Sequence, residues 1–246
     1  MTKDLLWRGM LAGILAALLA TLFARVYAEP LVDRAIAFEA AHESHAGMHG
    51  GHDDDGAEAP VSRAVQKSLG LATAAVLYGA ALGGIFSLVF AYCYGRVGRI
   101  GPRTLALLIA ALGFAIIAVV PALKYPPNPP AVGHGDTIQL RTAAYFAMIA
   151  VSIVALIVAA RVRTMLVGRW GAFNALVGAV AAYILVVALA QIGLPRIDEV
   201  PNDFPASLLW DFRIVSLGMQ LILWAAIGLG FGWMAERRLR RGVAPR

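Results

Sequence analysis

Six apolar stretches, each about as long as a membrane is thick, dominate this sequence. They lie at about Leu5–Ala28, Leu69–Tyr94, Thr104–Leu123, Thr142–Ala160, Gly171–Leu194 and Ile214–Ala235. A helix needs roughly 20 apolar residues to cross the hydrocarbon of a bilayer. A transmembrane barrel would instead alternate polar and apolar residues, and these runs are continuously apolar. We therefore expect an all-α, polytopic membrane helix bundle of about six transmembrane helices in contact with the lipid bilayer.

The composition fits a chain that lies almost entirely in lipid. The 246 residues are 60% hydrophobic and only 15% charged, whereas soluble proteins carry about 25% charged residues. No room is left for a large soluble domain, so we predict a single integral membrane domain over residues 1–246. The one cysteine, Cys93, excludes an intrachain disulfide and a metal site built from several thiolates.

The distribution of charge predicts the orientation of the spans. Thirteen Lys and Arg, opposed only by Asp4 and Glu236, lie at the N-terminus, in residues 95–103 and 161–170, and in the C-terminal tail. The other side holds seven basic residues and the remaining thirteen acids, while Arg25 falls within the first span. The positive-inside rule then places both termini in the cytoplasm and the remaining loops in the periplasm or extracellular space. The net charge of +6 thus reflects topology, and we expect no nucleic-acid partner.

The first span also has features of a signal peptide. Lys3 and Arg8 precede the apolar run, and Val26-Tyr27-Ala28 offers small residues for cleavage. Arg25 interrupts the end of the run, which favours an uncleaved span. If cleavage occurred, five spans would remain and every loop would keep its side.

Glycines recur four residues apart in three of the spans. The pairs are Gly9 and Gly13, Gly79 and Gly83, and Gly228 and Gly232. This spacing lets two helices approach closely in lipid. It predicts a closely packed bundle and says nothing about what the protein carries.

The outer loop at residues 29–68 is rich in potential metal ligands. Four of the five histidines lie in it within eleven residues, and three aspartates follow directly: His42, His45, His49, His52, Asp53, Asp54 and Asp55. Imidazole with carboxylate suits Co²⁺, Ni²⁺, Zn²⁺ or Cu²⁺. A helix would make His45 and His49 an i, i+4 chelating pair, but Gly47, Gly50 and Gly51 weaken a helix there. A flexible tether that collects ions with low affinity is an equal alternative, and a solvated polar loop is the simplest one. Capture should weaken below pH ~6.5, because ligation needs neutral imidazole.

Other polar residues near and within the spans are candidates for an ion pathway. They are Glu29, Asp33, Glu39, Asn128, Asn174, Glu199, Asp211 and Gln220. Glu29 and Asp33 would share a face of a short helix beginning at Pro30, and the prolines around Asn128 predict a stiff extended segment. The acids of the outer loop at 195–213 could attract cations. Each segment also has a purely structural alternative. It is an interfacial helix for residues 29–39, a rigid connector for the prolines around Asn128, and a solvated loop for residues 195–213. No Asp or Glu lies at the centre of a span, which disfavours a proton-coupled pump.

Taken together, these motifs resemble the CbtA family of predicted cobalt transporter subunits of bacteria. The resemblance rests on Glu29-Pro, Asp33-Arg-Ala-Ile-Ala-Phe-Glu39, the histidine loop, Tyr78-Gly-x-Ala-Leu-Gly-Gly84, Leu123-Lys-Tyr-Pro-Pro-Asn-Pro-Pro-Ala-Val-Gly133, Asn174, Glu199-Val-Pro201, Phe204-Pro205, Leu209-Trp210-x-Phe-Arg213 and Gln220. It covers nearly the whole chain in order. The resemblance implies Co²⁺ as the transported ion, a link to vitamin B12 synthesis, and a small single-span partner, CbtB, with its own histidine tail.

The leading hypothesis is a cobalt uptake subunit of the bacterial inner membrane whose outer loop collects the ion. The alternative is a non-transporting metal-binding or scaffold subunit that docks a separate transporter or sensor. A membrane enzyme fits least, because the sequence has no phosphate loop, no Gly-x-Ser-x-Gly and no HExxH motif. We therefore expect no ATP hydrolysis and no organic cofactor, and Ni²⁺ or Zn²⁺ remains possible as cargo.

Overall fold

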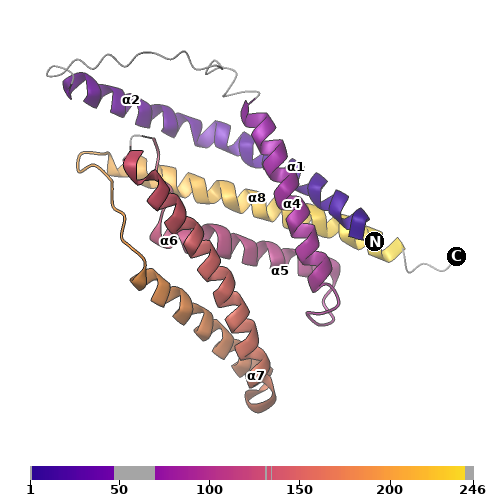
Figure 1. The fold of residues 1–246 in the computed structure, drawn as a ribbon. Coiled ribbons are helices and arrows are strands. Elements are labelled where there is room, and N and C mark those ends of the chain that lie inside the picture. The colour runs from indigo at the N-terminus through magenta and orange to yellow at the C-terminus, as the bar shows by residue number, and fades with distance from the viewer. Residues whose placement is uncertain (1, 47–69, 131, 134, 242–246) are drawn as a thin grey trace. The chain divides into compact units, whose positions relative to one another are not determined.

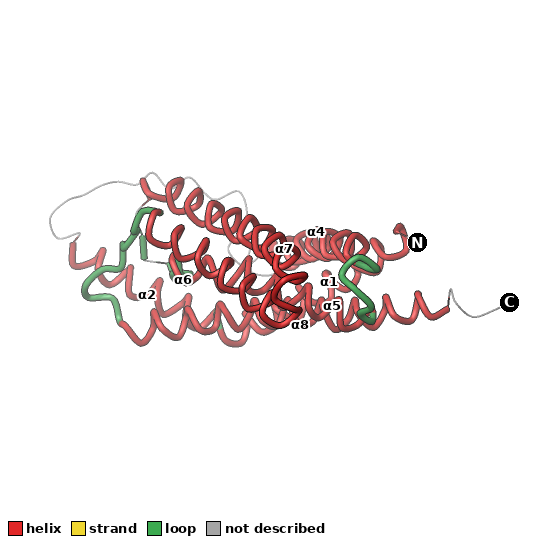
Figure 2. Tube along the Cα trace, turned by 90° about the horizontal axis from the view of Figure 1, so that it is seen from below, coloured by secondary structure: helices red, strands yellow, loops and turns green. Residues whose placement is uncertain are grey.

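The computed structural model describes residues 2–46, 70–130, 132–133 and 135–241, and every regular element among them is helical (Figure 1). The helices are α1 (Thr2–Tyr27), α2 (Glu29–Ala46), α4 (Leu71–Cys93), α5 (Pro102–Phe114), a π-helix (Ala115–Val119), α6 (Val120–Lys124), a 3₁₀ turn (Gly135–Thr137), α7 (Ile138–Gly193) and α8 (Ala206–Arg241). Among the described connections, residues 94–101 and 194–205 form loops and turns between helices (Figure 2). The prediction of an all-α fold is confirmed.

Five helical stretches are long and apolar enough to cross a membrane. They are Thr2–Tyr27, Leu71–Cys93, Pro102–Lys124, Ile138–Gly193 and Ala206–Arg240. The 56 residues of α7 would measure about 84 Å as one straight helix, far more than the ~30 Å of bilayer hydrocarbon.

Helix α7 is in fact a hairpin. Gly171 has φ 75° and ψ 170°, outside the helical region, and the chain reverses direction there (Figure 1). A positive φ is readily adopted by glycine, which has no Cβ. Each arm is long enough to cross the bilayer by itself, so the total of six crossings stays a prediction.

The chain divides into two compact units. Unit 1 consists of Met1–Gly113 and Trp210–Arg246, and unit 2 of Phe114–Leu209. The prediction of a single membrane domain is not tested by this division.

The centre of unit 1 is a backbone contact between α1 and α4. A Cβ on Gly13 would lie 2.0 Å from the carbonyl oxygen of Gly79, and one on Gly83 would lie 2.0 Å from that of Gly9. No side chain larger than hydrogen fits at these positions. The close packing predicted from the glycine spacing is therefore confirmed for both pairs.

Helix α8 packs in unit 1 through the third glycine pair. A Cβ on Gly228 would meet the Ala110 methyl at 2.6 Å, and one on Gly232 would meet that of Ala106 at 3.1 Å. These contacts hold α8 against α5. On another side of α8, the Phe231 ring meets those of two α4 phenylalanines, Phe86 and Phe90, edge to face at 5.4 and 5.0 Å between centroids.

Unit 2 is built around the two arms of α7. Met148 and Ala155 of the first arm pack with Val187 of the second and with Val120 of α6. Next to this cluster, the hydroxyls of Ser152 and Tyr183 lie 2.6 Å apart and hydrogen-bond the arms to each other. Buried polar groups in lipid need such partners.

A proline gives Tyr145 a specific role in unit 2. Pro121 follows the π-helix and has no amide hydrogen, so it cannot donate to the carbonyl of Ile117 four residues earlier. The Tyr145 hydroxyl of α7 donates to this carbonyl at 3.1 Å. The neighbouring helix thus satisfies a backbone group that lipid could not.

Candidate functional site

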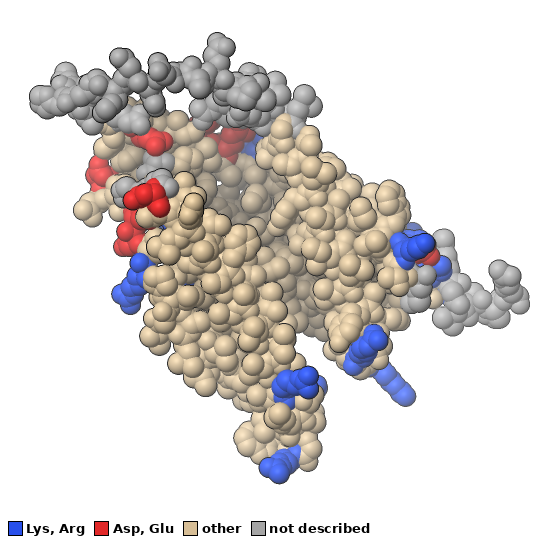
Figure 3. Space-filling view, viewed as in Figure 1, with Lys and Arg blue, Asp and Glu red and all other residues tan. Residues whose placement is uncertain are grey.

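Each unit separates most of its acidic side chains from a cluster of basic ones (Figure 3). In unit 1 the acids of α2 lie at the end where α1 leads into α2, and the opposite end carries Arg8, Arg96, Arg99, Arg103, Arg237, Arg238 and Arg240. In unit 2 the tip of the α7 hairpin carries Arg161, Arg163 and Arg169, while Asp136, Asp198, Glu199 and Asp203 lie in or beside the connections at the open end of the hairpin. We call these the acidic end and the basic end of each unit. Asp4 and Glu236 are the exceptions, because they lie at the basic end of unit 1.

Part of the proposed metal-collecting segment belongs to α2. His42 is exposed, its Nδ1 lies 3.0 Å from the carbonyl oxygen of Phe38, and the two rings lie 4.1 Å apart between centroids. His45 continues the same helix, but its side chain lies outside the described residues, as do the whole of His49, His52, Asp53, Asp54 and Asp55. Within the described ranges no three His, Cys, Asp or Glu come together as a metal site.

The expected helix after the first span is present. Helix α2 starts at Glu29 with Pro30 in its first turn, a position where the missing amide hydrogen of proline is not needed. Leu31 and Ala35 are buried along one side, and the Glu29 carboxylate lies 3.8 Å from Arg25. The helix is therefore amphipathic, as the interfacial-helix interpretation of this segment requires.

Three candidate acids of unit 1 are open to solvent or headgroups. Asp33 and Glu39 are exposed on α2, and Asp211 is exposed near the start of α8. The Asp4–Arg238 ion pair and the contact of Phe23 with Gly218 show that α1 and α8 run antiparallel. This register places Asp211 level with the start of α2. Carboxylates at one level of a helix bundle raise the local concentration of cations.

The acidic end of unit 2 is fastened by hydrogen bonds from α6 to the end of α7. The Lys124 ammonium donates to the carbonyl of Gln191, and the Gln191 amide donates to that of Val120 at 3.3 Å. The Tyr125 hydroxyl donates to the carbonyl of Pro195 at 2.8 Å. Burial raises the pKa of the Tyr125 phenol, so this donor stays protonated to a higher pH than a free tyrosine. The start of the proline segment is thus a fixed connector.

Glu199 is the candidate acid most enclosed by the protein. Its side chain is 9% exposed, and a carboxylate oxygen lies 3.4 Å from Nε of Arg141. The same guanidinium lies against Gly133, where an added Cβ would come within 2.2 Å of it, and Gly133 has φ 113°. Arg141 thus links the end of the proline segment to the loop after α7. In the sequence, Arg141 was only one of the seven basic residues on the predicted outer side. Its position in the chain gives no sign that Glu199 is its partner. Asn128 is half-buried in the same segment.

Two candidates lie apart from the acidic ends. Asn174 is exposed three residues after the Gly171 reversal, at the basic end of unit 2, and its amide donates to the carbonyl of Trp170 at 3.1 Å. Gln220 of α8 has a buried side-chain oxygen with no hydrogen-bond partner in the described part of the chain. One turn later, the indole nitrogen of Trp224 is likewise buried and unpartnered there. The Gln220 oxygen is therefore available to a water molecule or an ion.

One comparison with known proteins finds a match. The model of a family described as "Probable cobalt transporter subunit (CbtA)" matches residues 2–236. No curated protein and no solved structure matches the chain. The match covers every candidate metal and pathway residue, the whole of unit 2, and unit 1 as far as residue 236.

Proposed function

The chain belongs to the CbtA family of probable cobalt transporter subunits, and on that premise we propose that it takes up Co²⁺ across the bacterial inner membrane. The supporting observation is α2, which leaves the first apolar helix with exposed Asp33, Glu39 and His42 and leads directly into the remaining histidines and aspartates. In this proposal both termini are cytoplasmic and the acidic ends face the periplasm or extracellular space.

The His/Asp segment acts first, as a low-affinity collector. His42, His45, His49 and His52 supply imidazoles and Asp53–Asp55 supply carboxylates, a mixture suited to Co²⁺ and also to Ni²⁺ or Zn²⁺. Low affinity suits transport, because a tightly held ion would not leave. Collection weakens below pH ~6.5 as the imidazoles are protonated.

Polar groups along the units then guide the ion inward. Glu29, Asp33 and Asp211 attract it at the acidic end of unit 1, and the unpartnered oxygen of Gln220 offers a ligand further along α8. Asn128, Glu199 and Asn174 are the corresponding candidates in unit 2. A membrane potential of 100 mV supplies about 2.3 kcal/mol per elementary charge, hence roughly twice that for a divalent cation. The proposal includes no ATP, and it includes the single-span subunit CbtB as the partner.

Uptake of radioactive cobalt by cells tests the function. Cells that lack this chain and its partner receive the wild type, a variant with His42, His45, His49 and His52 replaced by Ala, or His134→Ala. His134 is the fifth histidine and lies outside the cluster, so it is the matched control. We expect wild-type uptake from the control and reduced uptake at low cobalt from the fourfold variant. Equal uptake with and without the chain and its partner would refute the proposal.

Experiments in proteoliposomes distinguish transport from a scaffold role and test which metal ion the protein prefers. Purified chain, alone and with CbtB, is offered Co²⁺ in competition with Ni²⁺ and Zn²⁺. Entry of Co²⁺ supports a transporter, whereas binding without entry in either preparation favours the metal-binding scaffold.

Sidedness is tested by labelling a cysteine at position 49 with a membrane-impermeant reagent. The native Cys93 is first replaced by Ala to remove the background. Labelling in intact spheroplasts is expected, and labelling only after lysis would contradict collection outside the cell.

A further inference from the structure

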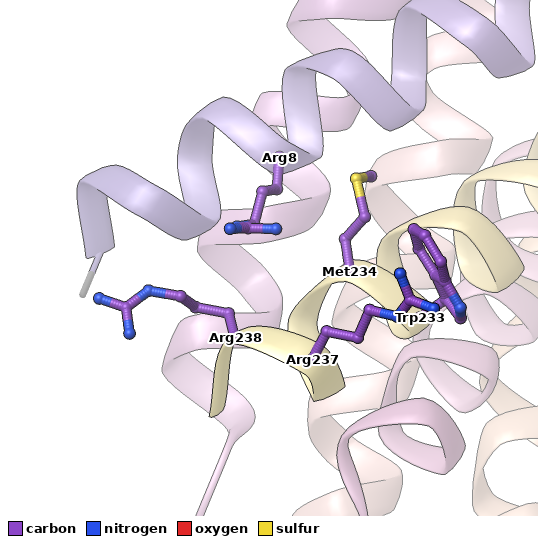
Figure 4. A pocket seen from close by; sticks show the side chains of 5 residues that line it. All are labelled: Arg8, Trp233, Met234, Arg237 and Arg238. Atoms are coloured by element: carbon purple, nitrogen blue, oxygen red, sulfur yellow. The ribbon is translucent and has the colours of Figure 1, made fainter. Parts of the chain in front are cut away.

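A cavity of about 200 Å³ opens at the basic end of unit 1, between α1 and α8 (Figure 4). It is lined by Arg8, Trp233, Met234, Arg237 and Arg238. Arg8 extends from α1 toward α8, and Met234 extends from α8 toward α1. The space equals that of several water molecules at roughly 30 Å³ each, enough for a small polar group.

The cavity has an excess of positive charge. Of its three guanidiniums, that of Arg238 is bound to Asp4, whose carboxylate accepts from Nε at 3.0 Å and from Nη2 at 2.8 Å. Neither Arg8 nor Arg237 forms an ion pair with a carboxylate of the described residues.

The nearby Glu236 is engaged elsewhere. Its carboxylate lies against Arg103 and 3.1 Å from Arg240, neither of which lines the cavity. Two positive charges therefore remain to attract an anion.

One wall of the cavity is apolar. The guanidinium carbon of Arg237 lies 3.7 Å from the centroid of the Trp233 ring, and Trp233 is 45% exposed. A guanidinium stacked on an aromatic face keeps its N–H edge free to donate. The apolar part of α8 also ends here, since Met234 and Ala235 are followed by charged residues. Tryptophan is typical of this level, where hydrocarbon meets headgroups.

We propose that this cavity binds the phosphate group of an anionic membrane lipid. Arg8 and Arg237 donate to the phosphate oxygens, a geometry to which the planar guanidinium is suited, and the lipid chains lie along Trp233 and Met234. Basic pockets between helices on the cytoplasmic side are typical sites for acidic headgroups. A soluble phosphate would accept the same hydrogen bonds, but it has no apolar part that could contact Trp233 and Met234. The bound lipid would connect the same two helices as the Asp4–Arg238 pair.

The test uses the purified full chain in a neutral detergent. Dioctanoyl phosphatidylglycerol, dioctanoyl phosphatidylcholine and inorganic phosphate are titrated in turn, and bound ligand is counted by native mass spectrometry. We expect phosphatidylglycerol to bind best. Equal occupancy by phosphatidylcholine would show that charge does not matter, and equal occupancy by inorganic phosphate would show that the site takes a soluble anion. Either result overturns the proposal.

Two variants and a control locate the site. The double variant Arg8→Gln with Arg237→Gln should lose affinity for phosphatidylglycerol by about tenfold or more, because two charge-assisted contacts disappear. Arg161→Gln with Arg169→Gln removes the same charge from the basic end of unit 2 and should bind like the wild type. A loss in the control as large as in the double variant would mean that net charge alone attracts the lipid.

A second measurement does not depend on the variants being folded. Wild-type protein in native membranes is cross-linked to a photoactivatable phosphatidylglycerol, and the labelled peptides are identified. Labelling should concentrate on residues 3–10 and 230–240. Labelling spread evenly over the helices, or unchanged binding by a folded double variant, would refute the site.

Discussion

The substitution Gly13→Ala tests how closely α1 and α4 must approach. The added Cβ would lie 2.0 Å from the carbonyl oxygen of Gly79 and 2.8 Å from the Cα of Gly83. Non-bonded heavy atoms pack best at about 3.5–4.0 Å. The two helices must therefore move apart by roughly 1 Å or more, because both close atoms belong to rigid helical backbone.

The expected cost follows from two opposing effects. Alanine favours the helix over glycine by about 0.5–1 kcal/mol, whereas overpacking of a closely packed site costs about 1–3 kcal/mol and sometimes more. Since the helices meet along two glycine pairs, separation at Gly13 also loosens the contact at Gly9 and Gly83. We expect a net destabilisation of about 1–2 kcal/mol.

Gly168→Ala is the matched control. Gly168 lies in α7, has no positive φ, and no atom would come within 4 Å of an added Cβ. It should stabilise the protein by up to about 1 kcal/mol through helix preference alone. Unfolding of both variants is followed by circular dichroism in mixed micelles with increasing dodecyl sulfate. If Gly13→Ala proves as stable as Gly168→Ala, the argument from backbone contact is wrong.

Three further predictions concern unit 2. Tyr145→Phe removes the hydrogen bond to the Ile117 carbonyl, which Pro121 cannot provide, so it should lower the stability by about 0.6–2 kcal/mol. In the Pro121→Ala background the same unfolding assay should show a smaller loss, and equal losses would contradict the assignment. Glu199→Gln removes an ion-pair partner of the half-buried Arg141 and should destabilise the protein by about 1–3 kcal/mol. The double variant Glu199→Gln with Arg141→Gln should cost less than the sum of the two single variants in the same unfolding assay, and additive costs would contradict the pairing. Because the pKa of Tyr125 is raised in the folded chain, its contribution to stability is full below about pH 10 and is lost as the pH rises through the folded pKa. Unfolding measured from about pH 9 to 11 should therefore show a steeper decline for the wild type than for Tyr125→Phe, and parallel declines would refute this.

The apolar runs were sufficient to predict the helical fold, because lipid allows few alternatives for a spanning backbone. They also placed the start of the fifth span at Gly171, where the arms of α7 reverse, but they made the first arm too short. Residues 161–170 were expected to form a connection, but they continue the helix as far as the reversal at Gly171. Arginine, leucine and methionine favour helix, and the segment contains no proline. The helix passes through Gly168 and reverses at Gly171, where φ is positive.

The candidate site could be predicted only where it depends on residues that are neighbours in the sequence. A helix start around Pro30 follows from helix chemistry, and in the structure α2 starts one residue earlier, at Glu29. The pairing of Arg141 with Glu199 joins positions far apart in the chain, so no local pattern could indicate it. The Tyr145 contact leaves a partial signal, since a proline inside a span requires some donor for a freed carbonyl. Which of the available hydroxyls supplies that donor depends on packing.

The crossing of α1 and α4 also limits where an ion can travel. Where the carbonyl oxygens of Gly9 and Gly79 press against the opposing backbone, no gap remains for even one water molecule, and a hydrated cobalt ion is larger still. Neither water nor an ion can pass between α1 and α4 at this crossing. If an ion crosses unit 1, as the proposed function requires, it must follow another surface, and the face of α8 that carries Gln220 is the candidate for it.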